Sequence, residues 1–236
     1  MLISEIGLNH LGDENLAMEY VRKLSAMKVD GITFQVPEDS FFQDPKNSHL
    51  KLSVECIYEA ISYVKSTGKQ IGIAICDLEL LEKFQSHDVD FYKVLSKDIN
   101  NEKLINRLVN KTDKKVLFSI GTSDFDQINQ LVDKICNKKD KVELIHTNFG
   151  EIDKEFLSKI SALKKKYKLP VGYGTHCKNK NSVYLSLAFE PSSILFYTKF
   201  DQKGIYPDND HAFTLSEVPD LISNIVSLKK AIGRFA

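Results

Sequence analysis

LISEIGLNHLGDENLAMEYVRKLSAMKVDGITFQ (residues 2–35) contains one complete unit of the fold that we predict for this chain. It begins with an apolar run, Leu2–Leu8, and ends with a second run, Gly31–Gln35, and both have the length and composition of strands. The segment between them repeats apolar side chains at the spacing of one helical face: Leu16, Tyr20, Leu24 and Met27. Asp13 stands where a helix N-cap belongs. A strand, a helix and a strand in this order predict two parallel strands joined by a right-handed crossover.

The same alternation of short apolar runs and helical segments continues along the chain. Eight runs are predicted as strands: Leu2–Leu8, Gly31–Gln35, Gln70–Ile75, Phe91–Leu95, Lys115–Ile120, Val142–Thr147, Pro170–Tyr173 and Ser193–Tyr197. Eight helical segments follow them: Glu14–Met27, Ser53–Thr67, Leu78–Ser86, Asn101–Asn110, Ser123–Lys138, Lys154–Lys166, Lys180–Leu187 and Leu215–Ala231. Eight such units match a (β/α)8 barrel, which typically takes about 250 residues. We therefore predict an α/β protein formed by a single TIM barrel over residues 1–236.

A doubly wound open sheet is the alternative fold. Such a sheet usually has fewer strands, and a Gly-rich GxGxxG turn is expected after its first strand. The corresponding turn here is Asn9–Asp13, NHLGD, which lacks that pattern. The barrel is therefore favoured. Two long loops, Val36–Lys51 and Lys199–Thr214, follow the second and eighth predicted strands, and loops of this length in a compact barrel are usually functional.

The composition of the chain argues against some classes of binding partner. The chain has 32 basic and 32 acidic residues, so it has no net charge that would draw it to nucleic acid or to an acidic membrane. No apolar run approaches the roughly 18 residues of a membrane span. The four cysteines are scattered and form no CxxC pair, as in a reduced intracellular protein. We predict a cytoplasmic protein that binds a small molecule, with no nucleic-acid or membrane partner.

In a TIM barrel, function is built at the C-terminal ends of the strands, so polar residues at those positions are the candidates. They are Asn9, His10, Gln35, Ser96, Asp98, Thr122, Asn148, Thr175, His176, Lys199, Asp210 and His211. A histidine at a strand end is often only a hydrogen-bonded residue of the rim, so position alone leaves each role open.

Two charged residues lie inside predicted strands. Lys93 stands within FYKVL and Glu5 within LISEIGL. An unpaired charge inside a barrel is costly, so an inward lysine needs an anion beside it. A Glu5–Lys93 pair inside the barrel would satisfy both residues, whereas an outward-facing Lys93 at a helix–strand seam is the alternative that the sequence leaves open.

Several of these segments, taken together and in order, resemble the sialic acid synthase family, whose members condense phosphoenolpyruvate with an aminosugar. Residues 3–13, ISEIGLNHLGD, resemble the AEIGxNHxGD signature, which is the most specific match. Further segments are similar to the family's KxxSxD/E, STG, HCT, GYSDH and PGPDH motifs: Lys93–Asp98, Ser119–Gly121, His146–Asn148, Gly172–His176 and Pro207–His211.

The resemblance implies a synthase of nonulosonic acids that works around a divalent metal, usually manganese and otherwise magnesium. By position, Lys93 and Ser96 would hold the phosphate or carboxylate, assisted by Ser119 and Asn148. Asp98, with Glu5, would stand near the reacting carbons, and His176 would bind the metal. Contacts to the sugar and the rest of the substrate would come from the remaining strand-end residues: Asn9, His10, Gln35, Thr175, Asp210 and His211.

The sequence also departs from the family's pattern. Thr33 replaces a phosphate-binding lysine, and Lys199 replaces the second metal-binding histidine. Lys199 would supply a positive charge where the metal sits in the family, or form a Schiff base. We also expect no antifreeze-like C-terminal domain. Three functions therefore remain: a synthase, a non-catalytic sugar- or phosphate-binding relative that needs a homodimer or a separately encoded partner, and a metal-independent aldolase that uses Lys93 or Lys199.

Overall fold

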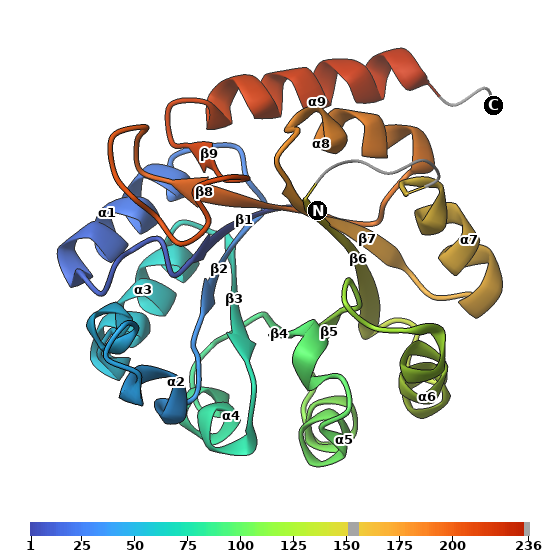
Figure 1. Cartoon of the computed structure of the whole chain (residues 1–236), viewed down its shortest axis with the longest axis horizontal. Coiled ribbons are helices and arrows are strands. Elements are labelled where there is room, and N and C mark those ends of the chain that lie inside the picture. The colour runs from blue at the N-terminus through green and yellow to red at the C-terminus, as the bar shows by residue number, and fades with distance from the viewer. Residues whose placement is uncertain (151–155, 234–236) are drawn as a thin grey trace.

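The computed structural model describes residues 1–150 and 156–233, and these form a closed parallel barrel surrounded by helices (Figure 1). Its strands are β1 (Leu2–Gly7), β2 (Gly31–Gln35), β3 (Gln70–Ile75), β4 (Phe91–Val94), β5 (Lys115–Ser119), β6 (Val142–Gly150), β7 (Val171–Cys177) and β8 (Ile194–Lys199). Each strand pairs in parallel with its neighbour, and β1 also pairs with β8, which closes the barrel. The predicted TIM barrel is confirmed.

The helices lie outside the strands (Figure 1). They are α1 (Glu14–Ser25), α2 (Asp39–Gln43), α3 (Val54–Ser66), α4 (Leu78–Gln85), α5 (Glu102–Lys111), α6 (Phe125–Ile135), α7 (Ser158–Tyr167), α8 (Asn181–Ser186) and α9 (Val218–Ile232). Short 3-10 turns occur at η1 (Ser48–Leu50), η2 (Ser96–Asp98) and η3 (Leu187–Phe189). None of the helices in the described ranges combines the length and the apolar character of a membrane span.

The element boundaries agree with the sequence pattern in most places. Asp13 caps α1, since its side chain accepts a hydrogen bond from the Leu16 N–H, and Asp77 caps α4 in the same way. The start of the helix predicted over 154–166 lies outside the described residues. The pattern missed α2 and η1, which form within the loop predicted over 36–51, and the two-residue strand β9 (Phe213–Thr214), which pairs with the end of β8.

Alternate residues of each strand point into the barrel. The middle of the interior is filled by one compact apolar layer: Ile3, Phe91, Leu117, Ile145 and Leu195. A side chain at Gly72 would lie 2.0 Å from the Phe91 ring, so glycine makes room for that ring. Because apolar side chains fill this layer, polar groups above it are separated from polar groups below it.

Candidate site at the barrel mouth

A cavity of about 240 Å3 opens at the C-terminal ends of the strands, above the apolar layer. Side chains from β2, β4, β5, β6, β7 and β8 and from the turns that follow line this cavity: Gln35, Lys93, Leu95, Ser96, Lys97, Ser119, Thr122, Thr147, Phe149, His176 and Tyr197. The volume suits a small ligand. Six of the residues predicted from the sequence therefore meet at one place, namely Gln35, Lys93, Ser96, Ser119, Thr122 and His176.

Lys93 is the buried cation of this cavity. Its side chain is 5% exposed, and its Nζ donates a hydrogen bond to Glu5 Oε2, so the expected Glu5–Lys93 pair is present. The ammonium also lies 5.6 Å from the centre of the Tyr197 ring. Within the described ranges, the other carboxylate oxygen, Glu5 Oε1, has no hydrogen-bond partner. The Tyr197 hydroxyl is nevertheless close to this carboxylate, since burial and then the charge of Glu5 raise the pKa of Tyr197 well above its ordinary value.

Hydroxyl groups surround the side of the cavity formed by β4, β5 and β6. Ser96 Oγ accepts hydrogen bonds from the Thr122 N–H at 3.0 Å and from Thr122 Oγ1 at 2.8 Å, and it lies 2.9 Å from Ser123 Oγ. Ser119 and Thr147 are buried beside this group. Several hydroxyl donors beside one ammonium form a site suited to phosphate or carboxylate oxygens.

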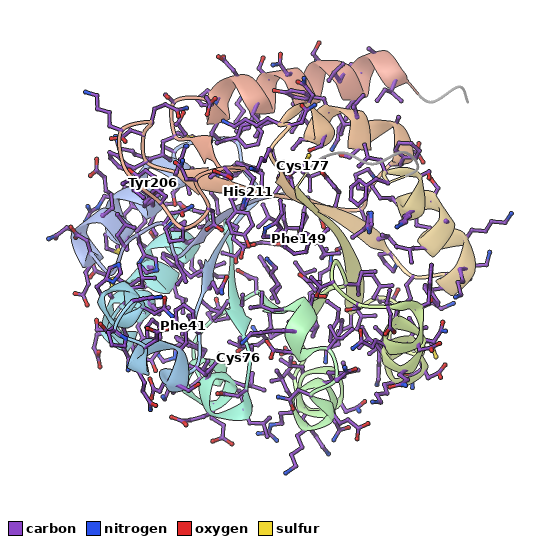
Figure 2. The ribbon with its side chains drawn as sticks, in the orientation of Figure 1. Phe41, Cys76, Phe149, Cys177, Tyr206 and His211 are labelled. Atoms are coloured by element: carbon purple, nitrogen blue, oxygen red, sulfur yellow. The ribbon has the colours of Figure 1, made fainter. Side chains whose placement is uncertain are left out.

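On the opposite side, His176 lines the cavity and packs against His211, which lies behind it and is not among the lining residues. The centres of the His176 and His211 rings are 4.6 Å apart, and each lies within 5 Å of the Tyr197 ring centre, at 4.7 and 4.9 Å. Figure 2 shows His211 and Phe149 near the centre of the barrel. Burial lowers the pKa of His176 to about 2 and that of His211 to about 4, so both imidazoles are neutral at pH 7.

Asp208 also lies beside these histidines, although it was not among the site residues predicted from the sequence. Its Oδ1 is 3.5 Å from His211 Nε2, and burial, with the charge of Glu5 as a second cause, raises its pKa to about 7. Gly7 provides the space: a side chain there would lie 2.8 Å from Asp208 Oδ2 and 3.0 Å from the Tyr197 ring. Gly7 also has φ +58°, which favours glycine. A glycine at the end of the strand that carries Glu5 was the one local signal for this close approach.

Asn9 and Lys199 hold the loop that carries Asp208. The Asn9 side chain donates to the Thr198 carbonyl at 2.9 Å and accepts from the Asp208 N–H at 3.1 Å. Lys199 is 4% exposed, and its Nζ donates to both oxygens of Asn209, the carbonyl at 3.0 Å and Oδ1 at 2.8 Å. Neither residue lines the cavity, so the structure places both in support of the loop.

Other predicted residues lie away from the cavity. Thr175 points outward to α8, with its Oγ1 3.3 Å from Ser182 Oγ. Asp210 is largely exposed and forms an ion pair with Lys178 at 3.1 Å. The Nδ1 of buried His10 accepts a hydrogen bond from the Gly12 N–H at 3.0 Å, beside a separate small cavity under α2 and η1.

Asp98 and Asn148 are the remaining predicted site residues. Asp98 belongs to η2, where burial raises its pKa and Glu38 and Asp77 are the acidic neighbours that raise it further. Its Oδ2 is buried and finds no hydrogen-bond partner in the part of the chain that the structure describes. The backbone of Asn148 pairs with Thr175, but its side chain lies outside the described part of the structure.

The side chains at the mouth do not match a divalent-metal site. Such a cation needs several oxygen or imidazole ligands around one point. Across residues 1–150 and 156–233, no group of three or more His, Cys, Asp or Glu side chains is placed to hold one. Lys199, at the second position implied by the resemblance, is a cation itself and directs its donors at Asn209. The prediction of manganese or magnesium therefore gains no support from these residues.

A TIM barrel with a ligand-sized cavity, lined by both polar and apolar side chains at the C-terminal ends of its strands, defines the class of this protein. Within that class, the chain belongs to the NeuB family, whose model matches residues 23–236.

Two known proteins and one crystal structure are among those similar to this chain. The chain is 27% identical to the uncharacterized protein MJ1065 of Methanocaldococcus jannaschii, over 98% of this chain and 72% of that protein. It is 22% identical to an N,N'-diacetyllegionaminic acid synthase of Campylobacter jejuni, over 99% of this chain and 77% of the synthase. The crystal structure of an N-acetylneuraminic acid synthetase from Leptospira borgpetersenii, in complex with citrate, superposes with a TM-score of 0.90 at 23% identity, covering 100% of this chain and 85% of that one. That structural likeness shows the shared fold.

Proposed function

We propose that this protein condenses phosphoenolpyruvate with an N-acyl aminosugar, or a related sugar aldehyde, in the biosynthesis of surface polysaccharides. It would be a transferase that forms a carbon–carbon bond. Membership of the NeuB family and the relationship to a legionaminic acid synthase support this proposal. The observation that carries it is the cavity itself, in which one buried ammonium, Lys93, faces a group of hydroxyls.

Enolpyruvate phosphate binds in this proposal with its anionic oxygens toward Lys93 and the hydroxyls of Ser96, Ser119 and Thr122. The ammonium contributes charge, and the hydroxyls contribute directed hydrogen bonds that fix the orientation of the enol. Glu5 keeps Lys93 in place while leaving part of its positive charge available to the ligand. Gln35, at the edge of the same cavity, is assigned to the sugar hydroxyls.

In this proposal the sugar aldehyde lies beside His176 and His211. Carbon 3 of the enolpyruvate attacks the aldehyde carbon, water adds at carbon 2, and the bond from carbon 2 to the phosphate-bearing oxygen breaks to release phosphate. The aldehyde oxygen gains negative charge as the carbon–carbon bond forms, and a neutral imidazole N–H of His176 or His211 is suited to stabilise it. Asp208, with a pKa of about 7, is suited to supply and accept the proton at neutral pH.

Phosphate release is the direct test of this function. The protein is incubated with phosphoenolpyruvate and a panel of N-acyl hexosamines, with manganese and separately with a chelator, and free phosphate is measured. We expect phosphate release that depends on one of the sugars. Release should be lost in Lys93→Met and kept in Lys134→Met, which removes a solvent-accessible lysine paired with Glu102. No phosphate release under any condition would overturn the proposal.

A non-catalytic binding protein is the second candidate, and one observation favours it. Glu5 already neutralises Lys93, and Thr33 adds no charge beside them, so the net positive charge available to phosphate is small. Calorimetry that shows tight binding of phosphoenolpyruvate or a sugar phosphate without turnover would support this function over the synthase. A metal-independent aldolase fits less well, because Lys93 and Lys199 are both engaged with oxygen acceptors. A covalent adduct trapped by borohydride with a keto acid would restore that function.

A further inference from the structure

The loop between β8 and β9 is fastened from inside the barrel. Lys199, the last residue of β8, is buried and gives two hydrogen bonds to Asn209. Asn9, in the turn that follows β1, bridges the Thr198 carbonyl and the Asp208 N–H. Two consecutive loop residues are thus held by two buried side chains, one from the end of β8 and one from the turn after β1.

These hydrogen bonds fix the loop and thereby determine which of its side chains reach the mouth of the barrel. Asp208 enters the space left by Gly7, and His211 reaches the rings of Tyr197 and His176. Further out, Tyr206 lies on the same loop (Figure 2). A buried ammonium bonded to two oxygens of one residue is a strong and directional constraint, since hydrogen bonds from charged donors are about twice as strong as neutral ones.

We propose that Lys199 is a positioning residue which orders the mouth of the barrel as an internal cation, and that the mouth consequently binds no divalent metal. Lys199 holds Asn209 and thereby sets the positions of Asp208 and His211. The inference concerns the site of the proposed function, but it stands on loop geometry and its tests require no turnover.

The nearby positive charges and the shortage of coordinating side chains among the described residues both disfavour the binding of a divalent cation at the mouth. Lys93 and His176 line the same cavity, and the Lys93 ammonium lies 5.6 Å from the centre of the Tyr197 ring, which packs on His176, so a second ammonium group stands near the imidazole. Aromatic rings occupy much of the space around that imidazole, with the centres of Phe149 and Tyr197 at 4.8 and 4.7 Å. Glu5 offsets the charge of Lys93, but the Lys199 ammonium carries no such carboxylate partner in the contacts described, and a dication would find too few ligands among the described residues.

Amide hydrogen exchange of the complete chain tests the positioning role. In Lys199→Met, which keeps the chain length but removes the charge, exchange of the Asp208 and Ala212 amides should accelerate by at least about tenfold, because bonds from a charged donor are lost. Asn209→Ala, which keeps Lys199 but removes one of its acceptors, should accelerate the same amides by a smaller factor.

Lys178→Met is the matched control. Lys178 also binds this loop, through Asp210, but that ion pair is exposed, with side-chain exposures of 58% and 64%. Its loss should leave the exchange of both amides within about twofold of wild type. Equal acceleration in Lys178→Met and Lys199→Met, or none in Lys199→Met and Asn209→Ala, would overturn the positioning role.

Electron paramagnetic resonance of Mn²⁺ tests the second half of the proposal. Wild-type protein titrated with manganese up to millimolar concentration should leave the signal of the free ion unchanged. Stoichiometric loss of that signal, reversed by substitution of His176 with alanine, would show a metal at the mouth and overturn the proposal. This outcome is distinct from failure of the proposed reaction, which would appear only as absence of phosphate release.

Discussion

Two glutamates are buried inside the same barrel, one on each side of its apolar layer, and each faces a lysine. At the N-terminal end, Glu143 receives a hydrogen bond from Lys115 on Oε2 and bonds from Ser192 and Ser193 on Oε1, at 2.5, 2.7 and 2.5 Å. Both of its oxygens are satisfied. At the C-terminal end, Glu5 Oε2 is paired, while Oε1 has no hydrogen-bond partner among the described residues.

The two glutamates therefore differ in how completely their oxygens are hydrogen-bonded within the described residues. A buried polar atom without a partner costs free energy, so an incompletely bonded carboxylate calls for an explanation other than stability. Several groups at the C-terminal, open end also have displaced pKa values, among them Asp208, His176 and His211. We infer that the N-terminal pair maintains the fold and that the C-terminal pair serves the ligand.

The largest effect should come from removing the lysine at the open end. Lys93→Met should lower phosphate release by roughly 10³-fold, because one preorganised charge at an anionic transition state is worth that much. Lys115→Met removes the corresponding lysine at the closed end and should leave the rate per folded molecule unchanged. The measurement is steady-state kinetics on both variants, and equal losses in the two would contradict the division between the ends.

The next effect concerns stability at the closed end. Glu143→Leu should lower the free energy of unfolding by about 3 kcal/mol, since Ser192 and Ser193 lose their acceptor and Lys115 loses its partner. Urea denaturation measures this loss, and ligand affinity should stay at the wild-type value. A loss of under about 1 kcal/mol would show that the closed end is not a stabilising arrangement.

The third prediction concerns the pH dependence of stability that buried His10 causes. Burial lowers the pKa of His10 to about 4 from 6.5, so between these values the unfolded chain binds more protons and stability falls as pH falls. His10→Asn keeps an acceptor for the Gly12 N–H and removes the titration. Between pH 7 and pH 5, the variant should lose about 2 kcal/mol less than wild type. Denaturation at several pH values measures the difference.

Ser192→Ala is the control for this pH series. It removes one bond at the closed end, so its stability should be lower than that of wild type by about the same amount at every pH. A wild-type and a His10→Asn protein with parallel pH curves would show that His10 is not the group responsible.

The barrel could be predicted from the sequence because it follows from periodicity, whereas the charged pair was one of two alternatives, favoured by the cost of burying an unpaired charge. Gly31–Gln35 and Gln70–Ile75 form strands with the expected bounds. The sequence left the direction of Lys93 open between an inward pair with Glu5 and an outward position, and the structure shows the inward pair, which meets the cost of burying either charge alone. The strand bounds depend on local spacing, which a single sequence displays.

The direction of side chains beyond the strand ends could not be predicted in this way. Thr175 and His176 are adjacent, yet one faces α8 and the other faces the cavity. The inward position of Asp208 depends on the empty volume at Gly7 and on the amide of Asn9, which is 199 positions away in the sequence. Contacts of such long range leave no periodic trace in the chain.

The smallest effect is also the sharpest comparison, because it replaces both members of each pair. Glu5→Leu with Lys93→Met should leave the free energy of unfolding within about 1 kcal/mol of wild type, or raise it, since the replacement removes an unpaired buried oxygen and the charge that helps raise the pKa of Asp208. Glu143→Leu with Lys115→Met should still lose about 2 kcal/mol, because two serine hydroxyls remain without their acceptor. Urea denaturation of the two double variants measures both values. If the first lost as much as the second, Glu5 and Lys93 would be as necessary to the fold as Glu143, and the open oxygen would not mark a site kept for a ligand.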